Sequence, residues 1–289
     1  MRRAFRMTFA PARQTTALVA LLCVALLSAA LAFHIPSANA AEENEPVSQC
    51  LAMAHGIGGV QYASLTPVAL ETGEVSITFV GHATLRIETQ GGIVIATDYN
   101  GRAGPGRAPD VVTMNRAHYT HYTSAPDPAI SHVLRGWGED GKPARHRLRV
   151  GDVYIRNVTT DIRSSEEIGR LEDGNSIFIF EVAGLCIGHL GHLHHELTAS
   201  QRAKIGRLDI VFVPVDGGYT MAQSAMIQVL QDLRASIVIP MHAFGPHTLE
   251  RFVAGMKGSF RIEYAIDPTV TVSLRTLPDT PEVLVMPGF

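Results

Sequence analysis

The sequence has little charge, few cysteines and, after its first 40 residues, no run of basic side chains. Charged residues make up 18% of the chain beside 46% hydrophobic residues, which is typical of a folded globular protein with a sizeable core. The missing basic run argues against nucleic acid as a partner. Neither an internal repeat nor a second regime of composition occurs, so we expect one globular domain.

The first 40 residues predict a secretory signal peptide. Four arginines form a basic start, an apolar run interrupted only by Ser28 spans residues 17–33, and Ala38-Asn39-Ala40 is a small-x-small cleavage site. We therefore expect cleavage after Ala40 and a periplasmic or secreted protein without stable membrane association. The alternative is that the apolar run stays as an N-terminal membrane anchor. The chain without this leader has 20 of the 24 basic residues and all 27 acidic ones, so its net charge is near −7.

Two cysteines, Cys50 and Cys186, remain beyond this leader. In an oxidising compartment they could pair as a disulfide. Cys186, however, lies in the middle of the apolar segment LCIGHL, a position that favours the role of a small buried side chain. Both interpretations stay open, and burial without pairing is the favoured one.

Short apolar segments separated by turns predict a domain over residues 74–289, after an N-terminal extension over residues 41–73. Strands are expected at residues 74–80, 85–88, 93–98, 111–114, 152–158, 175–182, 185–190, 209–215, 236–241 and 260–265. Helices are expected at residues 127–134, 198–206, 246–256 and, most clearly, from residue 220 onward. There Thr220 and Gln223 suit a capping box, and the apolar positions that follow share one helical face. Because early strands form hairpins and later ones alternate with helices, we expect an α/β fold with helices outside mixed sheets.

Histidines follow three of the expected strands. His118 and His121 come after the segment VVTM, four histidines lie within residues 189–195, and His242 follows IVIPM. Neutral imidazole is the commonest metal ligand, and zinc requires three or four ligands that converge from different elements. A single histidine is more simply a polar loop residue, but loops at one edge of a sheet can converge, so we expect a metal site. For His82, in the segment GHAT, a structural role and a place in this site are equally favoured.

These segments resemble the metallo-β-lactamase superfamily, in particular its exported or lactonase-like branch. The matching segments are VGHATLRIET, IVIATD, VVTMNRAHYTH, GNSIFIFEVAGLCIGHLGHLHHELT, LDIVFVPVDGGYTM and IVIPMHAFG, which follow the family's order and cover roughly residues 75–250. The resemblance implies an αββα sandwich of two mixed β-sheets flanked by helices. It also implies one or two metal ions, usually zinc, at the common edge of the sheets, and hydrolysis of a small-molecule substrate.

The first metal motif departs from the family. Where members have His-x-His-x-Asp-His, this chain has Arg116, His118, Thr120 and His121 at the four ligand positions. Two ligand residues are therefore kept, one is replaced by a cation and one by a neutral hydroxyl. Arg116 is expected either to contact an anionic substrate group or an oxyanion, or to fill the space of a missing metal with its own charge.

The second motif departs as well, since His192 stands where the family has an aspartate that bridges two metals. An imidazole bridges or neutralises two dications poorly, so we expect a single ion, with zinc favoured over iron or manganese. The expected ligands are His118, His121, His192 and His242, and further candidates for the metal or its surroundings are Asp161, His189 and His195.

The predicted function is an exported hydrolase that uses one metal-bound water on an ester, lactone, amide or phosphoester. The alternative is a catalytically inactive member of the superfamily that serves as a metal- or ligand-binding module.

Overall fold

The computed structural model describes residues 47–54, 73–139, 142–163 and 169–288. The expected signal peptide, residues 1–40, and most of the expected extension lie outside these ranges. None of the described helices is long and apolar enough to cross a membrane.

Six strands form the smaller of two sheets, in the order β13-β1-β2-β3-β4-β5. They are β1 (Val75–Gly81), β2 (Thr84–Thr89), β3 (Val94–Ala96), β4 (Val111–Met114), β5 (His132–Arg135) and β13 (Thr269–Val272). β1 pairs antiparallel with both β13 and β2, and β2 pairs antiparallel with β3. β3, β4 and β5 are parallel, so the sheet is mixed.

Eight strands form the larger sheet, in the order β12-β14-β11-β10-β9-β8-β7-β6. They are β6 (Arg147–Val150), β7 (Val153–Arg163), β8 (Arg170–Val182), β9 (Leu185–His189), β10 (Ile210–Pro214), β11 (Ile237–Met241), β12 (Arg261–Tyr264) and β14 (Glu282–Val285). Strands β6 to β9 form an antiparallel meander. Strands β9, β10, β11, β14 and β12 are parallel to one another.

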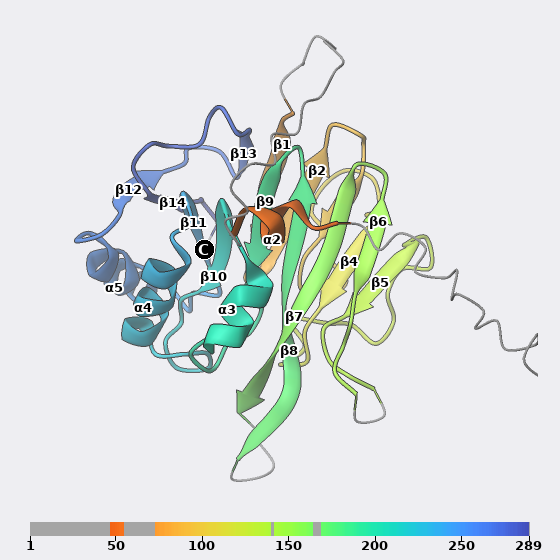
Figure 1. Ribbon diagram of the computed structural model, residues 1–289, viewed down its shortest axis with the longest axis horizontal. Coiled ribbons are helices and arrows are strands. Elements are labelled where there is room, and N and C mark those ends of the chain that lie inside the picture. Colours follow the sequence, from red (N-terminus) through yellow and green to blue (C-terminus); the bar gives the residue numbers. More distant parts are fainter. Residues whose placement is uncertain (1–46, 55–72, 140–141, 164–168, 289) are drawn as a thin grey trace, which may run out of the picture. The chain divides into compact units, whose positions relative to one another are not determined.

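The two sheets pack face to face around a core that includes Phe178, Phe180 and Phe212, all fully buried. Each such side chain contributes roughly 1.5–3 kcal/mol by leaving water. The helices are α2 (Gln49–Ala54), α3 (Ala199–Ile205), α4 (Gln223–Leu233) and α5 (Pro246–Met256). They cover the outer face of the larger sheet, where Leu230 and Phe252 are buried (Figure 1). The predicted sandwich of mixed sheets flanked by helices is confirmed.

The predicted helix over residues 127–134 is wrong. The side chain of Asp127 accepts the backbone N–H of Ala129, and its carbonyl accepts that of Ile130, which makes a turn rather than a helix. Residues 132–135 then join the sheet as β5, beside β4. Pairing with an existing strand outweighs the local preference of so short a segment.

The predicted capping box at Thr220 and Gln223 is also wrong. The Thr220 hydroxyl and backbone N–H both donate to Asp216, so this hydroxyl is not available to α4. The helix begins after Ala222, which makes no side-chain cap. The apolar face of α4 is confirmed, with Met226 and Leu230 buried against the sheet.

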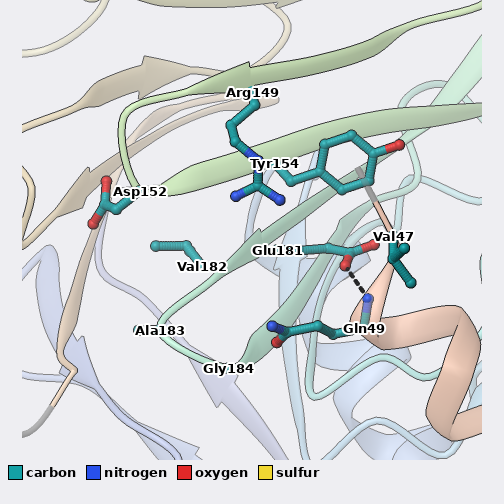
Figure 2. A pocket seen from close by; sticks show the side chains of 9 residues that line it. All are labelled: Val47, Gln49, Arg149, Asp152, Tyr154, Glu181, Val182, Ala183 and Gly184. Carbon is teal, nitrogen blue, oxygen red and sulfur yellow. Dashed lines mark hydrogen bonds between the residues drawn. The ribbon is translucent and has the colours of Figure 1, made fainter. Parts of the chain in front are cut away.

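The N-terminal end of the described chain is fastened to the larger sheet by Glu181 of β8. Its carboxylate accepts the Ser48 hydroxyl at 2.6 Å and the backbone N–H groups of Gln49 and Cys50 at 2.9 and 3.4 Å. Figure 2 shows the Glu181 side chain pointing at the backbone nitrogen of Gln49. A carboxylate at this position satisfies the N–H groups that the start of α2 leaves without partners.

Arg156 of β7 completes this arrangement from the other side of Glu181. Its Nε donates to the carboxylate at 2.7 Å, and its two terminal nitrogens donate to the carbonyls of Lys204 and Ile205 at the end of α3. Next to it, Cys50 and Cys186 form a disulfide, so the favoured interpretation of an unpaired Cys186 is wrong. We call Ser48, Cys50, Arg156, Glu181 and Cys186 the anchor.

Candidate metal centre

Parallel strands of both sheets end at one edge of the sandwich. Because β3 and β4 are parallel in one sheet and β9, β10 and β11 in the other, the loops that follow them meet there. The side chains delivered by these loops, together with the turn after β1, are His82, Asp98, His118, His121, His192, Asp216 and His242. The fold therefore collects residues that are far apart in the sequence.

Five histidines lie against one another at this edge. One ring nitrogen from each of His82, His118, His121 and His242 lies within 4.8 Å of the others. The ring of His192 is 4.9 Å from those of His121 and His242, centroid to centroid. We call these five residues the histidine centre. His118, His121, His192 and His242, the ligands expected from the sequence, are all brought together, and His82 joins them.

Several nitrogens of the histidine centre have no hydrogen-bond partner. Among the described residues, five buried side-chain nitrogens or oxygens lack one, and four of these are histidine Nε2 atoms: those of His82, His121, His192 and His195; the fifth is Nε of Arg207. A buried polar atom without a partner costs about 1–3 kcal/mol, so a concentration of them at one place indicates an absent ligand. The Nε2 atoms of His118 and His242 are 3.4 Å apart, close to the separation of about 3.4 Å for two nitrogens on a tetrahedral zinc. The residues present therefore fit a divalent metal.

Two buried carboxylates orient two of the imidazoles. Nδ1 of His121 lies 2.5 Å from Asp98, and Nδ1 of His242 lies 3.1 Å from Asp216. An ionised carboxylate only accepts hydrogen bonds, so Nδ1 of each ring carries the proton and donates it in a hydrogen bond, and the Nε2 lone pair stays available to the centre. Asp98 is in turn held by the side-chain amide of Asn115 at 2.9 Å. This is the arrangement that protein metal sites use to fix the tautomer of a ligating histidine.

Burial favours the neutral form of His82 and His121. Loss of hydration, with smaller effects from neighbouring histidines, lowers the pKa of His82 to about 3 and that of His121 well below its usual value. Burial raises the pKa of Asp98 to about 6, because desolvation outweighs the nearby histidines and Asn115. Burial also opposes ionisation of Asp216, but hydrogen bonds from His242, Thr220 and backbone N–H groups lower its pKa overall. Neutral imidazoles are the form that binds metal.

The backbone at the centre is unusual. His82, Asp98 and His242 have φ values of 52°, 40° and 58°, in the left-handed region that residues with a Cβ seldom adopt. The backbone N–H of His242 donates to the carbonyl of His82 at 2.6 Å, which joins the two sheets across the site. Strained conformations of this kind persist where the surrounding structure enforces them, often at functional sites.

A chain of hydrogen bonds runs from Arg163 through His194 to Nδ1 of His192. The backbone N–H and the side-chain Nε of Arg163 both donate to Nδ1 of His194, at 2.7 and 3.3 Å. Nε2 of His194 lies 2.5 Å from Nδ1 of His192. Burial and the charge of Arg163 lower the pKa of His194 to about 4. A guanidinium nitrogen of Arg163 also donates to the carbonyls of residues 218–220, so the chain is tied to the loop after β10.

The remaining candidates from the sequence lie around the centre rather than in it. Both ring nitrogens of His189 bond to the backbone, Nε2 to the carbonyl of Ala83 and Nδ1 to the N–H of Gly191. Asp161 accepts the N–H of Asp173 and pairs with Arg170. His195 has an Nε2 without a partner but contributes no atom to the four-histidine group.

Arg116 is exposed. With Trp137, Lys142 and Asp173 it lines a hollow of about 310 Å³. Arg116 is two residues before His118, so the hollow shares a loop with the centre. An exposed guanidinium does not occupy the place of a metal, so that interpretation is not supported.

Sequence reasoning missed the two carboxylates of the site. Asp98 and Asp216 each follow a buried strand, in the segments IVIATD and VFVPVD. The same criterion that singled out His242, a polar residue directly after an apolar strand, would have found both. His194 and Arg163 carried no such signal, because their role depends on contacts between distant loops.

Comparisons with known proteins agree with this geometry. A family model described as "Beta-lactamase superfamily domain" matches residues 76–242. A UPF0173 metal-dependent hydrolase of Methanosphaerula palustris is 26% identical over 180 residues, which cover 57% of this chain and 82% of that protein. A protein of the metallo-beta-lactamase superfamily from Thermotoga maritima has a solved structure that is 28% identical, with a TM-score of 0.53, covering 73% of this chain and 98% of that one. A structure from Parabacteroides distasonis, 18% identical with a TM-score of 0.50, covers 65% of this chain and 90% of that one and shows the shared fold.

Proposed function

The chain belongs to the beta-lactamase superfamily, and we propose that it is an exported hydrolase that depends on a single metal ion. Like the UPF0173 proteins that it resembles, it is a metal-dependent hydrolase. The observation that carries the proposal is the group of buried histidine Nε2 atoms without partners, at the edge where the loops of both sheets meet. A fold that needed these histidines only for packing would have paired their nitrogens within the protein.

The ion would be held by His118, His121 and His242, with His82 as the fourth nitrogen within reach. A divalent ion bound there supplies Lewis acidity and a source of hydroxide near neutral pH. The protein's own contribution is to hold His121 and His242 in the correct tautomer through Asp98 and Asp216. Substrates that suit this chemistry are esters, lactones, amides and phosphoesters, in which water attacks an electrophilic carbon or phosphorus.

One ion, with zinc as the favoured metal, fits this donor set better than two. The group of possible ligands contains only imidazoles. Asp98 and Asp216 face the Nδ1 atoms of His121 and His242, on the far side of each ring from the centre. Without a bridging carboxylate, two dications would repel each other with nothing between them to neutralise the charge.

Arg116 is the residue we propose to meet the substrate beyond the centre. Its side chain is exposed, lies in the same loop as His118 and lines the hollow beside Trp137. An Arg offers a planar fork of donors that suits a carboxylate or phosphate group. Replacement by Gln should raise KM for anionic substrates while metal binding stays unchanged.

Export is supported by the disulfide of the anchor as well as by the leader. A structural disulfide such as Cys50–Cys186 persists in oxidising compartments and is rare in the cytosol. We propose that the protein acts in the periplasm or outside the cell.

Metal analysis of the purified protein tests the function. We expect one equivalent of zinc, iron or manganese, and hydrolysis of at least one member of a panel of esters, lactones, amides and phosphodiesters. His118→Ala and His242→Ala should lose the metal and lower activity by at least about a thousandfold, since the metal supplies several kcal/mol. His247→Ala is the control, because its side chain is 96% exposed.

Three outcomes would contradict the proposal. No bound metal after reconstitution would refute the metal dependence, and two equivalents would refute the single ion. A metal without activity on any substrate of the panel would favour a binding protein instead.

A further inference from the structure

Three imidazoles of the histidine centre, those of His121, His192 and His242, differ in the group that bonds to Nδ1. Nδ1 of His121 and Nδ1 of His242 each face a carboxylate. An ionised carboxylate can only accept a hydrogen bond, so Nδ1 of each ring must carry the proton. His192 is backed by another histidine, His194. The direction of the hydrogen bond between these two rings decides which atom of His192 carries its proton.

The backbone of Arg163 fixes that direction. A backbone N–H can only donate, so Nδ1 of His194, 2.7 Å away, must be the acceptor. The Nε of Arg163, which also has only a proton to offer, points at the same atom. A neutral His194 with a bare Nδ1 carries its proton on Nε2. That proton is donated to Nδ1 of His192, 2.5 Å away.

The hydrogen bond from His194 in turn fixes the position of the proton on His192. Because Nδ1 of His192 accepts a hydrogen bond, neutral His192 carries its proton on Nε2. This Nε2 is buried, has no partner in the protein, and belongs to a ring 4.9 Å from those of His121 and His242. His192 therefore presents an N–H to the centre where its neighbours present lone pairs. An N–H nitrogen does not ligate a metal.

We infer that His192 is a catalytic hydrogen-bond donor rather than a metal ligand, and that His194 and Arg163 are the residues that position it. The donor would contact the substrate oxygen that becomes negative as the carbonyl or phosphoryl group is attacked. This role rests on the proposed function, since it needs a substrate at the centre. This role accounts for the presence of His192 at the position where the superfamily has a bridging aspartate.

The geometry suits this role for a further reason. The side chain of His192 cannot turn easily, because its Nδ1 bonds to His194 and its ring is buried among the other histidines. A donor held in place before the substrate arrives stabilises a developing negative charge without reorganising. Removal of one such donor typically lowers kcat by a factor of about 100 to 1000.

The tautomer of His192 can be measured on the metal-free wild-type protein by ¹⁵N NMR of the imidazole rings. We expect the proton of His192 on Nε2 and those of His121 and His242 on Nδ1. After loading with ¹¹³Cd, couplings to the metal should appear for His121 and His242 and not for His192. A proton on Nδ1 of His192, or a cadmium coupling to it, would overturn the inference.

Substitutions separate a donor from a ligand in a second way. His192→Ala should bind metal within about threefold of the wild-type affinity, yet lose activity by the factor expected for one donor. His242→Ala should lose the metal itself. If His192→Ala releases metal to the same extent as His242→Ala, then His192 is a ligand. If the wild-type protein binds no metal, the proposed function fails, whereas the tautomer can still be read in the metal-free protein.

His194 offers a matched pair that tests the positioning role. His194→Phe keeps a ring but removes the donor, so the Nδ1–H form of His192 should appear in the spectrum. His194→Gln keeps an N–H near the same position and should retain the Nε2–H form. Equal spectra for these two variants would show that His194 does not set the tautomer.

Discussion

The anchor and the histidine centre lie at opposite ends of β9, and they differ in whether their buried polar atoms have hydrogen-bond partners. At the anchor, both carboxylate oxygens of Glu181 accept hydrogen bonds and all three nitrogens of Arg156 donate them. At the histidine centre, three Nε2 atoms have no partner. The unpartnered Nε2 atoms are themselves buried, so exposure to solvent does not account for the difference.

This difference distinguishes buried polar groups that stabilise the fold from buried polar groups that are available to bind a ligand. An ion pair such as Arg156–Glu181 stabilises a buried region only when its remaining donors and acceptors are also satisfied. A metal and substrate site must instead leave lone pairs and N–H groups without partners in the protein, which bears the cost of their desolvation until a ligand binds. Three experiments can sharpen or break this contrast.

The largest effect is expected from Glu181→Ala at the anchor. Removal of the carboxylate leaves the Arg156 guanidinium buried without its counter-charge, so unfolding free energy should fall by about 3–5 kcal/mol. Urea unfolding measures this loss, and zinc affinity of the folded variant should remain that of the wild type. The control Glu263→Ala removes one partner of a half-exposed ion pair with Arg261 and should cost no more than about 1 kcal/mol. A loss of zinc affinity in Glu181→Ala would show that the two regions are coupled.

A smaller effect is expected when the histidine centre receives its ligand. Zinc in free excess of about a hundredfold over its Kd should raise the unfolding free energy by about 2.7 kcal/mol, because it binds the folded protein. Thermal unfolding with zinc and with a chelator measures the gain. The gain should vanish in His242→Ala and persist in His247→Ala. An equal gain in both variants would place zinc outside the histidine centre.

The smallest effect is expected from Asp98→Asn, behind His121. The amide can donate toward Nδ1 and thereby move the imidazole proton to Nε2, the atom that must be bare to bind metal. Zinc affinity should fall about ten- to a hundredfold, as for other residues that orient a ligand, and a competition titration with a chromogenic chelator measures it. Asp232→Asn is the control, since Asp232 is exposed and makes a long ion pair with Arg202 and an exposed hydrogen bond with Gln228. Unchanged affinity in Asp98→Asn would mean that the carboxylate has no part in setting the tautomer.

Local signals in the sequence were sufficient for ten of the strands and for much of the centre, but not for β5, β6, β13 and β14. Each of His118, His121 and His242 follows an apolar strand, and parallel pairing brings the ends of such strands to one edge. The helix α3 could also be predicted from local sequence, because Thr198 and Gln201 form a capping box and Gly206 ends the helix. In these places the local preference and the final structure agree.

Contacts between distant segments account for what the sequence did not reveal. The disulfide joins cysteines 136 residues apart, and nothing near Cys186 distinguishes a paired cysteine from a buried one. Thr220 bonds to Asp216 instead of capping α4 because the turn before the helix brings that carboxylate closer. The tautomer of His192 depends on the end of β7, about 30 residues earlier in the chain, and no motif in the histidine segment itself encodes it.

The left-handed backbone of His82 and His242 has a consequence for how this protein would change under selection for stability alone. Glycine adopts such a conformation without strain, whereas a side chain with a Cβ does so at a cost. His82→Gly and His242→Gly would relieve that cost and remove two desolvated imidazoles at the same time. A library screened only for thermal resistance should therefore accumulate glycine at these two positions, and each such variant would be a more durable protein that has lost its metal centre.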